Sequence, residues 1–259
     1  MRMMKKVLGV VTVLALSVSL LAGCGSTAAS PVSSAASTAA ESTTSSVVSE
    51  ATSAAADENA AAAAQLLNDL TGSYQELWPV ILADEYKQTW LDDCTALVGE
   101  DNAEAAFEKL SSMVTGDVYG EDAVKAYANG GGAYFCGFTN DLATLTFDGE
   151  TSTISGTDKD GNELFSHPYH YIGMEPVRGL YEFESDDADS GEFTYFFLAP
   201  DTSAETYHIE FRYGSDADAL SQYDAGDYAY WLASGISTDC DQTMIDNCIE
   251  LFCTENLAG

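Results

Sequence analysis

Beyond residue 64, apolar residues follow two different spacings in turn. They first recur every three or four positions, which is typical of amphipathic helices. The residues at this spacing are Leu70, Tyr74, Leu77, Trp78 and Ile81, and then Ala106, Phe107, Leu110, Met113 and Val114. Asn102 precedes the second helical stretch, and residues 123–128 predict a further short turn. We therefore expect the folded part of the chain to begin with helices.

After the three glycines at 130–132 the spacing changes to two, which indicates β-strands. The expected strands cover residues 133–138, 142–147, 152–155, 163–172, 179–184, 192–198 and 205–213. Asp148-Gly149 and Asp160-Gly161 are hairpin-turn sequences. No segment has βαβ spacing, so we expect a mainly β fold, an antiparallel meander that closes into a barrel. A C-terminal helix is predicted from the apolar face of residues 240–252, with Ser237 or Thr238 as its cap.

The first 23 residues have the pattern of an export signal. Arg2, Lys5 and Lys6 form a basic head, and residues 7–22 form an apolar run that is too short for a permanent membrane span. The run ends at Leu21-Ala22-Gly23-Cys24, which resembles the lipobox of bacterial lipoproteins. That resemblance implies cleavage before Cys24 and a lipid anchor on it, at the extracytoplasmic face of the cell membrane. An ordinary secretory signal is the alternative.

Residues 24–63 predict a disordered tether between this anchor and a folded domain at 64–259. The tether consists mostly of Ser, Thr and Ala, and no aromatic residue occurs before Tyr74. Such a composition buries too little apolar area to offset the entropy of the chain. For residues 25–56, which have this composition throughout, a flexible coil reaches roughly 30 Å. A glycosylated stalk is the alternative, and the Ala-rich stretch at 57–70 predicts a helix.

The negative net charge of the chain argues against nucleic acids and anionic membrane surfaces as binding partners. There are 9 Lys and Arg against 42 Asp and Glu, which gives a formal net charge of -33. A chain this acidic repels the phosphate backbone of nucleic acids and the surface of an anionic membrane. It attracts cations without selecting among them. We therefore expect no nucleic-acid partner and an affinity for positive ions.

The cysteines predict buried thiols rather than a zinc cluster. Besides Cys24 the chain has Cys94, Cys136, Cys240, Cys248 and Cys253. An odd number cannot pair completely within one chain, and no Cys-x-x-Cys is present. Cys240 and Cys248 would lie about 12 Å apart along one helix, which is too far for a disulfide bond. A single pair that includes Cys94 or Cys136 stays open.

No catalytic motif is recognisable, so we do not expect an enzyme. The sequence lacks Gly-x-Ser-x-Gly, His-Glu-x-x-His, a phosphate-binding glycine loop and a Cys–His nucleophile context. Residues 158–162 read Asp-Lys-Asp-Gly-Asn, but the glutamate that a calcium loop needs at position twelve is Tyr169. We interpret these residues as a hairpin turn. The acidic run at 186–189 is interpreted as a solvated turn between strands.

The strand region resembles a known family. The motifs are Phe193-Thr194-Tyr195-Phe196-Phe197-Leu198-Ala199-Pro200, Thr206-Tyr207-His208-Ile209-Glu210-Phe211 and Gly214-Ser215-Asp216, with weaker agreement at 171–173, 179–184, 70–79 and 228–231. They resemble the ZinT (YodA-like) family of exported zinc- and cadmium-binding domains. The resemblance covers most of residues 65–255 and implies a lipocalin-like (calycin) barrel with flanking N-terminal helices and a C-terminal helix. Such domains also occur fused to the solute-binding lipoproteins of zinc transporters.

The family's three histidine ligands are only partly present. The resemblance places them at Phe196, Thr206 and His208, so a single imidazole remains at those positions. A rebuilt site could combine His208 and Glu210, which share one strand face, with His170 and His167 from an earlier strand. Two imidazoles and a carboxylate suit zinc or another divalent ion. We therefore name His208, His170, His167 and Glu210 as candidate metal ligands.

Two functions follow from these observations. The first is extracytoplasmic binding of a divalent metal, zinc by resemblance, by a membrane-anchored lipoprotein, with a metal ABC transporter as a candidate partner in zinc uptake. The second is a non-metal, lipocalin-like module that binds a small apolar ligand or a partner in the cell envelope. The 14 Tyr and 11 Phe residues that could line a cup favour the second function, as does the replacement of two histidines by Phe196 and Thr206.

Overall fold

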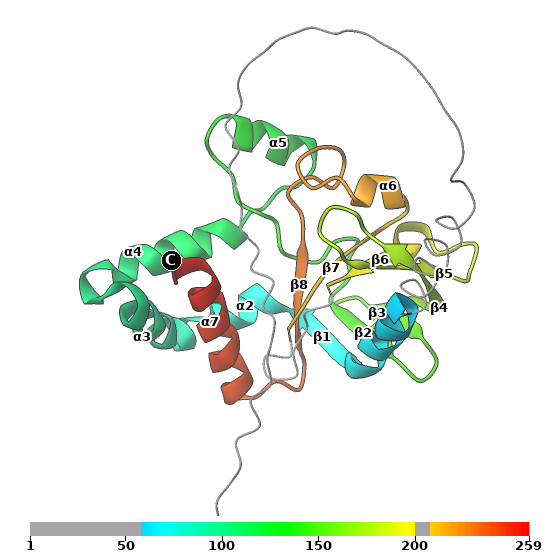
Figure 1. Cartoon of the computed structure of the whole chain (residues 1–259), viewed down its shortest axis with the longest axis horizontal. Coiled ribbons are helices and arrows are strands. Elements are labelled where there is room, and N and C mark those ends of the chain that lie inside the picture. Colours follow the sequence, from blue (N-terminus) through cyan, green and yellow to red (C-terminus); the bar gives the residue numbers. More distant parts are fainter. Residues whose placement is uncertain (1–57, 200–207, 259) are drawn as a thin grey trace, which may run out of the picture. The chain divides into compact units, whose positions relative to one another are not determined.

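The computed structural model describes residues 58–199 and 208–258 (Figure 1). The predicted export signal with Cys24, most of the predicted tether, and Thr206 lie outside these residues. In the described part of the chain, no helix combines the length and the apolar character that crossing a membrane requires.

The centre of the fold is a closed antiparallel barrel, in which each strand pairs with its neighbours in chain order and the last strand pairs with the first. Its strands are β1 (Gly72–Glu76), β2 (Thr144–Asp148), β3 (Thr153–Thr157), β4 (Glu163–Met174), β5 (Tyr181–Ser185), β6 (Tyr195–Leu198), β7 (His208–Gly214) and β8 (Ala233–Ser237). Closure satisfies the backbone groups of every edge. The predicted fold class, a mainly β lipocalin-like barrel with flanking helices, is confirmed.

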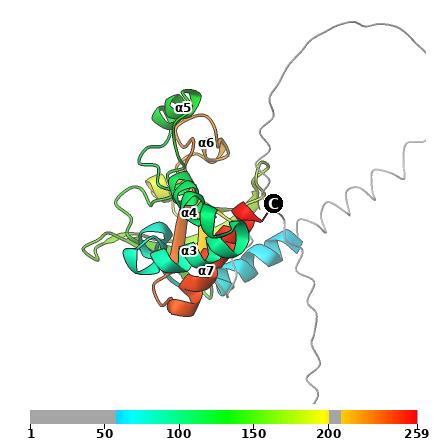
Figure 2. The ribbon, with the colours of Figure 1, turned by 90° about the vertical axis from the view of Figure 1, so that its left-hand side faces the viewer.

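The helices α3 (Lys87–Val98), α4 (Glu100–Val114) and α7 (Gln242–Leu257) group together on one side of the barrel (Figures 1 and 2). Residues 58–69 are helical. The other α-helices are α2 (Leu77–Ile81), α5 (Glu121–Ala128) and α6 (Ala217–Leu220). α3, α4 and α7 pack on one another and share a second core with Trp78 and Trp90. The two short 3-10 turns are η1 (Asp84–Tyr86) and η2 (Gly191–Phe193).

Aromatic rings fill the interior of the barrel. Phe196 is fully buried, and its ring centroid lies 5.3 Å from that of Tyr213 and 5.4 Å from that of Tyr169. Phe165 stacks on Phe193 at 3.9 Å. Large rings that contact one another in this way leave the middle of the barrel packed rather than open as a cup.

Two segments differ from the sequence-based prediction. Residues 70–81 were expected to form one helix, but residues 72–76 form strand β1 and only Leu77–Ile81 is helical. The reason is tertiary: β1 supplies the strand that joins β2 to β8 and so closes the barrel, which outweighs a local helical pattern. Residues 133–138 were expected to form a strand, but they form only isolated bridges outside the barrel.

The C-terminal part contains one strand that the sequence pattern did not predict. β8 takes the closing position in the barrel, directly before the final helix. The final helix itself is confirmed as α7. Its N-terminal cap is Asp241, whose carboxylate accepts a hydrogen bond from the Met244 amide at 3.0 Å, so the prediction of Ser237 or Thr238 as the cap is wrong. Ser237 instead belongs to β8.

The turn at 158–162 has the predicted hairpin geometry. The Asp158 carboxylate accepts hydrogen bonds from the backbone amides of Asp160 at 2.8 Å and Asn162 at 2.9 Å. The hydrogen bond from the Asn162 side chain, together with these backbone bonds, lowers the pKa of Asp158 below its usual value. Gly161 adopts φ +82°, a left-handed conformation that glycine tolerates without strain. The carboxylate of Asp158 is therefore engaged in closing the turn.

The five cysteines of the described chain are free thiols, and four of them are buried, which confirms the buried-thiol prediction. Burial raises the pKa of Cys136 and of Cys248 to about 12, so both thiols are neutral at physiological pH. The Sγ atoms of Cys94 and Cys253 lie 3.9 Å apart in the core between α3 and α7.

A single buried arginine fastens the 217–230 segment to the barrel. Arg212 of β7 is fully buried and donates hydrogen bonds to the backbone carbonyls of Leu220 and Tyr228, with the Gln222 carbonyl at 3.4 Å. Its guanidinium also stacks on one face of Tyr223, 4.4 Å from the ring centroid. Arg178 stacks on the same ring at 4.3 Å. This segment thus has a charged, hydrogen-bonded anchor in addition to the apolar contact of the fully buried Leu220 with the core.

Candidate metal-binding surface on strands β4 and β5

Two of the predicted site histidines lie on β4 and face opposite sides of the barrel wall. His167 shares a face with Phe165 and Tyr169, both of which are buried in the core. Its ring packs against these two rings with centroid distances of 5.9 Å and 6.5 Å. His170 falls on the alternate face and its side chain is 52% exposed. His170 is therefore the imidazole that solvent ions can reach.

Carboxylates at the end of β5 engage both imidazoles. The His170 Nδ1 atom lies 2.7 Å from Asp186 Oδ1, and the His167 Nδ1 atom lies 2.9 Å from Asp187 Oδ2. The second ring nitrogen of His170, Nε2, lies 4.0 Å from Glu184 Oε2. Each imidazole is thus oriented through Nδ1, and Nε2 of His170 faces a further carboxylate.

The hairpin register explains why these groups meet. In the pairing of β4 with β5, His170 lies directly opposite Glu184. The chain then turns back over β4, and the Asp186 amide donates a hydrogen bond to the Pro168 carbonyl at 2.9 Å. The turn is held further by Ser190, whose hydroxyl donates to Ser185 Oγ at 2.7 Å. The carboxylates of Asp186 and Asp187 are therefore placed by a defined turn that packs on the neighbouring strand.

His208 and Glu210 lie elsewhere in the barrel. Both belong to β7, on the face opposite to that of the buried Ile209 and Phe211. β5 and β6 lie between β4 and β7 in the barrel, which corresponds to roughly 14 Å of sheet at about 4.8 Å for each strand spacing. The structure thus brings His167 and His170 to one hairpin but does not bring them together with His208 and Glu210.

The described donors do not fit a closed zinc site. Within residues 58–199 and 208–258, no three or more His, Cys, Asp or Glu side chains gather in a way that could hold a metal ion. A closed tetrahedral site needs four N, S or O donors from the protein. Phe196, one of the family ligand positions, lies inside the barrel and is fully buried. The outer surface of β4 and β5 offers a metal ion two donors, His170 Nε2 and the Glu184 carboxylate. Asp186 lies on the other side of the imidazole, at Nδ1.

Sequence reasoning missed the acidic half of this surface. The sequence pattern predicts a solvated turn at residues 186–189, and nothing in it distinguishes Glu184 from the other carboxylates. The available signal was the predicted hairpin, in which the strand with His170 is followed by a strand with Glu184. Once the register is known, these two residues lie side by side. The register shift between Tyr171 and Gly173, a β-bulge, could not be foreseen from the pattern.

Comparisons with known proteins give a likeness of fold. The sequence matches no protein-family model, and it matches no curated protein. Two solved structures from Streptococcus pneumoniae are similar. The Zn(II)-bound ZinT-like domain of AdcA has 15% sequence identity and a TM-score of 0.45, over 71% of this chain and 89% of that chain. Zn(II)-bound AdcA has 13% identity and a TM-score of 0.43, over 72% of this chain and 35% of that chain.

Proposed function

We propose that the chain is a divalent-metal-binding domain, and that its binding centre is the outer surface formed by His170, Glu184 and Asp186. One observation carries the proposal: His170 Nε2 lies 4.0 Å from Glu184 Oε2 while Nδ1 lies 2.7 Å from Asp186. A metal ion between Nε2 and Glu184 would have one nitrogen and one oxygen ligand. Asp186 would fix the tautomer by accepting the Nδ1 proton, as carboxylates behind metal-bound histidines commonly do.

An open site of this kind suits a metal that is carried rather than permanently held. Two protein ligands leave the remaining coordination positions to water, so the ion can be exchanged. Imidazole with carboxylate suits zinc and other first-row divalent ions. The formal net charge of -33 raises the local concentration of any cation around the domain. The sequence resemblance to the ZinT family supports zinc as the metal and a metal ABC transporter as the receiving partner.

The metal test compares substitutions at the β4–β5 surface with matched substitutions on β7. The full chain is titrated with Zn²⁺ by calorimetry in excess Ca²⁺, which occupies unspecific carboxylates. We expect His170→Gln and Glu184→Gln to weaken Zn²⁺ binding about tenfold or more, and Asp186→Asn to weaken it by about tenfold. His208→Gln and Glu210→Gln are the controls and should bind as the unaltered chain does. Binding should also weaken as the pH falls, because a histidine ligand must be deprotonated.

Two results would contradict this assignment. If all five variants bind zinc like the unaltered chain, the ion is held only by the diffuse acidic surface. If His208→Gln loses binding and His170→Gln does not, the centre lies on β7 and the β4–β5 surface is not the site. Each substitution is at an exposed or half-exposed position, so the variants should fold.

The proposal includes the place of action, which is the extracytoplasmic face of the cell membrane. Its support is the sequence around Cys24, which resembles a lipobox and precedes the Ser-, Thr- and Ala-rich segment. In cells fed an alkyne-tagged fatty acid, the unaltered chain and the control Cys136→Ser should be labelled, and Cys24→Ser should not. Label that persists in Cys24→Ser would refute acylation at this residue.

A further inference from the structure

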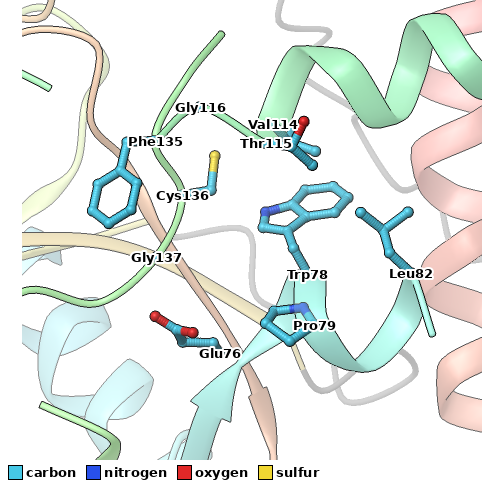
Figure 3. A pocket seen from close by; sticks show the side chains of 10 residues that line it. All are labelled: Glu76, Trp78, Pro79, Leu82, Val114, Thr115, Gly116, Phe135, Cys136 and Gly137. Carbon is cyan, nitrogen blue, oxygen red and sulfur yellow. The ribbon is translucent and has the colours of Figure 1, made fainter. Parts of the chain in front are cut away.

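A cleft outside the barrel is separate from the β4–β5 surface and shares no residue with it. It lies between α2, the end of α4 and the 133–137 segment, and has a volume of about 330 Å³ (Figure 3). An apolar cavity of roughly 150 Å³ is already large enough to hold benzene. The lining residues that the argument uses are Glu76, Trp78, Leu82, Val114, Phe135 and Cys136. Most of the lining side chains are apolar, as in small-molecule sites.

The walls of the cleft are held in place by backbone hydrogen bonds. The Phe135 amide donates to the Tyr230 carbonyl at 2.9 Å, and the Ser234 amide of β8 donates to the Cys136 carbonyl at 3.0 Å. On the other wall, the Gly116 amide donates to the Tyr134 carbonyl at 3.0 Å. A Cβ at Gly116 would lie 2.4 Å from the Ala133 carbonyl oxygen, so only glycine permits this approach. The cleft is therefore preformed.

One buried donor in this cleft has only a weak partner. The side chain of Trp78 is nine-tenths buried, with 8% of the residue exposed, and its Nε1 makes no well-formed hydrogen bond in the described structure. It interacts only with the Cys136 thiol. The other two tryptophans are satisfied: Trp90 Nε1 donates to the Ile81 carbonyl at 2.7 Å, and Trp231 Nε1 donates to the Gly137 carbonyl at 2.9 Å. Figure 3 shows the Trp78 nitrogen turned toward the Cys136 side of the cleft. Buried N–H groups without a partner are rare in native proteins and costly.

The remaining polar groups restrict the charge of an occupant. Glu76 accepts a hydrogen bond from the Phe138 amide at 2.6 Å and places a carboxylate at the edge of the cleft. The Cys136 thiol, whose pKa burial raises to about 12, is neutral and only a weak acceptor for the indole N–H. An anion would meet Glu76 and the acidic surface of the chain. An uncharged molecule with an oxygen acceptor meets an apolar wall and an indole N–H whose present acceptor is only a weak thiol.

We propose that this cleft binds a small uncharged molecule with an apolar ring and a carbonyl-type oxygen, and that the oxygen accepts the Trp78 indole N–H. The ring packs against Leu82, Val114 and Phe135. The site lies outside the barrel, whose interior is occupied by its own aromatic rings. It is independent of metal binding, since it shares neither residues nor chemistry with the His170 surface.

The three indole N–H groups provide a direct test. The full chain, labelled with ¹⁵N in its tryptophans, is titrated with acetophenone, which has a ring and a carbonyl oxygen. We expect the indole signal of Trp78 to shift with a saturable dependence in the millimolar range, as for a ligand of this size. The signal of Trp90, whose N–H is already bonded in the helical core, is the internal control and should not move. Ethylbenzene, which lacks the acceptor, and benzoate, which is an anion, should bind several-fold more weakly.

Two variants distinguish the contribution of the Trp78 N–H donor from that of the free volume in the cleft. Trp78→Phe keeps a ring but removes the N–H, and acetophenone binding, followed on the ligand's own signals, should weaken about fivefold. Val114→Phe keeps the donor and fills the cleft, so the Trp78 signal should no longer respond. A Trp78 signal that stays still in the unaltered chain overturns the proposal without reference to any variant. If ethylbenzene shifts the Trp78 signal as strongly as acetophenone does, the oxygen acceptor has no part in binding. If acetophenone shifts the Trp78 signal of Val114→Phe as it does in the unaltered chain, the ligand binds outside this cleft.

Discussion

Replacing Phe196 with alanine should lower the free energy of unfolding by about 4 kcal/mol, because it removes a fully buried ring from the centre of the barrel. The ring lies against Phe165, Tyr169, Phe211 and Tyr213, with centroid distances between 5.3 Å and 6.4 Å. These neighbours are held by the backbones of two strands, β4 and β7, so they cannot all collapse into the space. Urea denaturation followed by near-UV circular dichroism measures the change.

Phe196→Leu is the matched control, since it retains most of the apolar volume. We expect it to lower the free energy of unfolding by about 1 kcal/mol. Losses of the same size in both variants would mean that ring packing is not what stabilises the barrel. A loss below about 1 kcal/mol for Phe196→Ala would mean that the interior is open enough to lose a ring without cost, which would revive the idea of a ligand cup.

Arg212→Met should lower the free energy of unfolding by about 3 kcal/mol. The substitution leaves the backbone carbonyls of Leu220 and Tyr228 without the donors that the guanidinium provides, and each unsatisfied buried acceptor costs about 1–3 kcal/mol. Loss of the stacking contact with Tyr223 adds to the effect. Chemical denaturation gives the size of the loss, and hydrogen exchange should show faster exchange in the 217–230 segment than in β2 and β3.

Arg178→Met tests whether the hydrogen bonds of Arg212 or the stacking of arginines on Tyr223 contribute more to the free energy of unfolding. Arg178 also lies over the Tyr223 ring but is half-buried, and its side chain donates to a tyrosine hydroxyl at 3.2 Å rather than to backbone carbonyls. We expect a loss below about 1 kcal/mol. If Arg178→Met destabilised the chain as strongly as Arg212→Met, the stack would carry the stability, and the carbonyl contacts would be secondary.

Most of the barrel could be predicted from alternation and turn residues, because these are local signals. β2 to β7 each overlap an expected strand, and the Asp160-Gly161 turn joins β3 to β4 as expected. The errors fall where long-range pairing decides the structure. β1 has apolar residues at a helical spacing, yet Tyr74 packs inside the barrel on Phe147, and the backbone pairs with β2 and β8. No local pattern reveals a pairing with a strand near the other end of the chain.

The candidate metal surface could be predicted only in part, for a different reason. Histidine is rare in this chain, so the imidazoles stood out, and His170 was named from the sequence. Asp and Glu together number 42, so no single carboxylate stood out, and Glu184 and Asp186 were selected only by the hairpin geometry. The cleft at Trp78 had no signal at all. It depends on the path of the 133–137 segment, which was expected to be a strand.

The pairing of β1 with β8 has a consequence for how the chain acquires its fold. Tyr74 and Ser237 are paired across β1 and β8 although roughly 160 positions separate them. The barrel therefore cannot close until β8 has been synthesised. Until then β1 and β7 each present unpaired backbone to their surroundings, and such edges invite pairing between neighbouring chains. A molecule truncated just before Ala233 should accordingly aggregate more readily than the chain that contains β8.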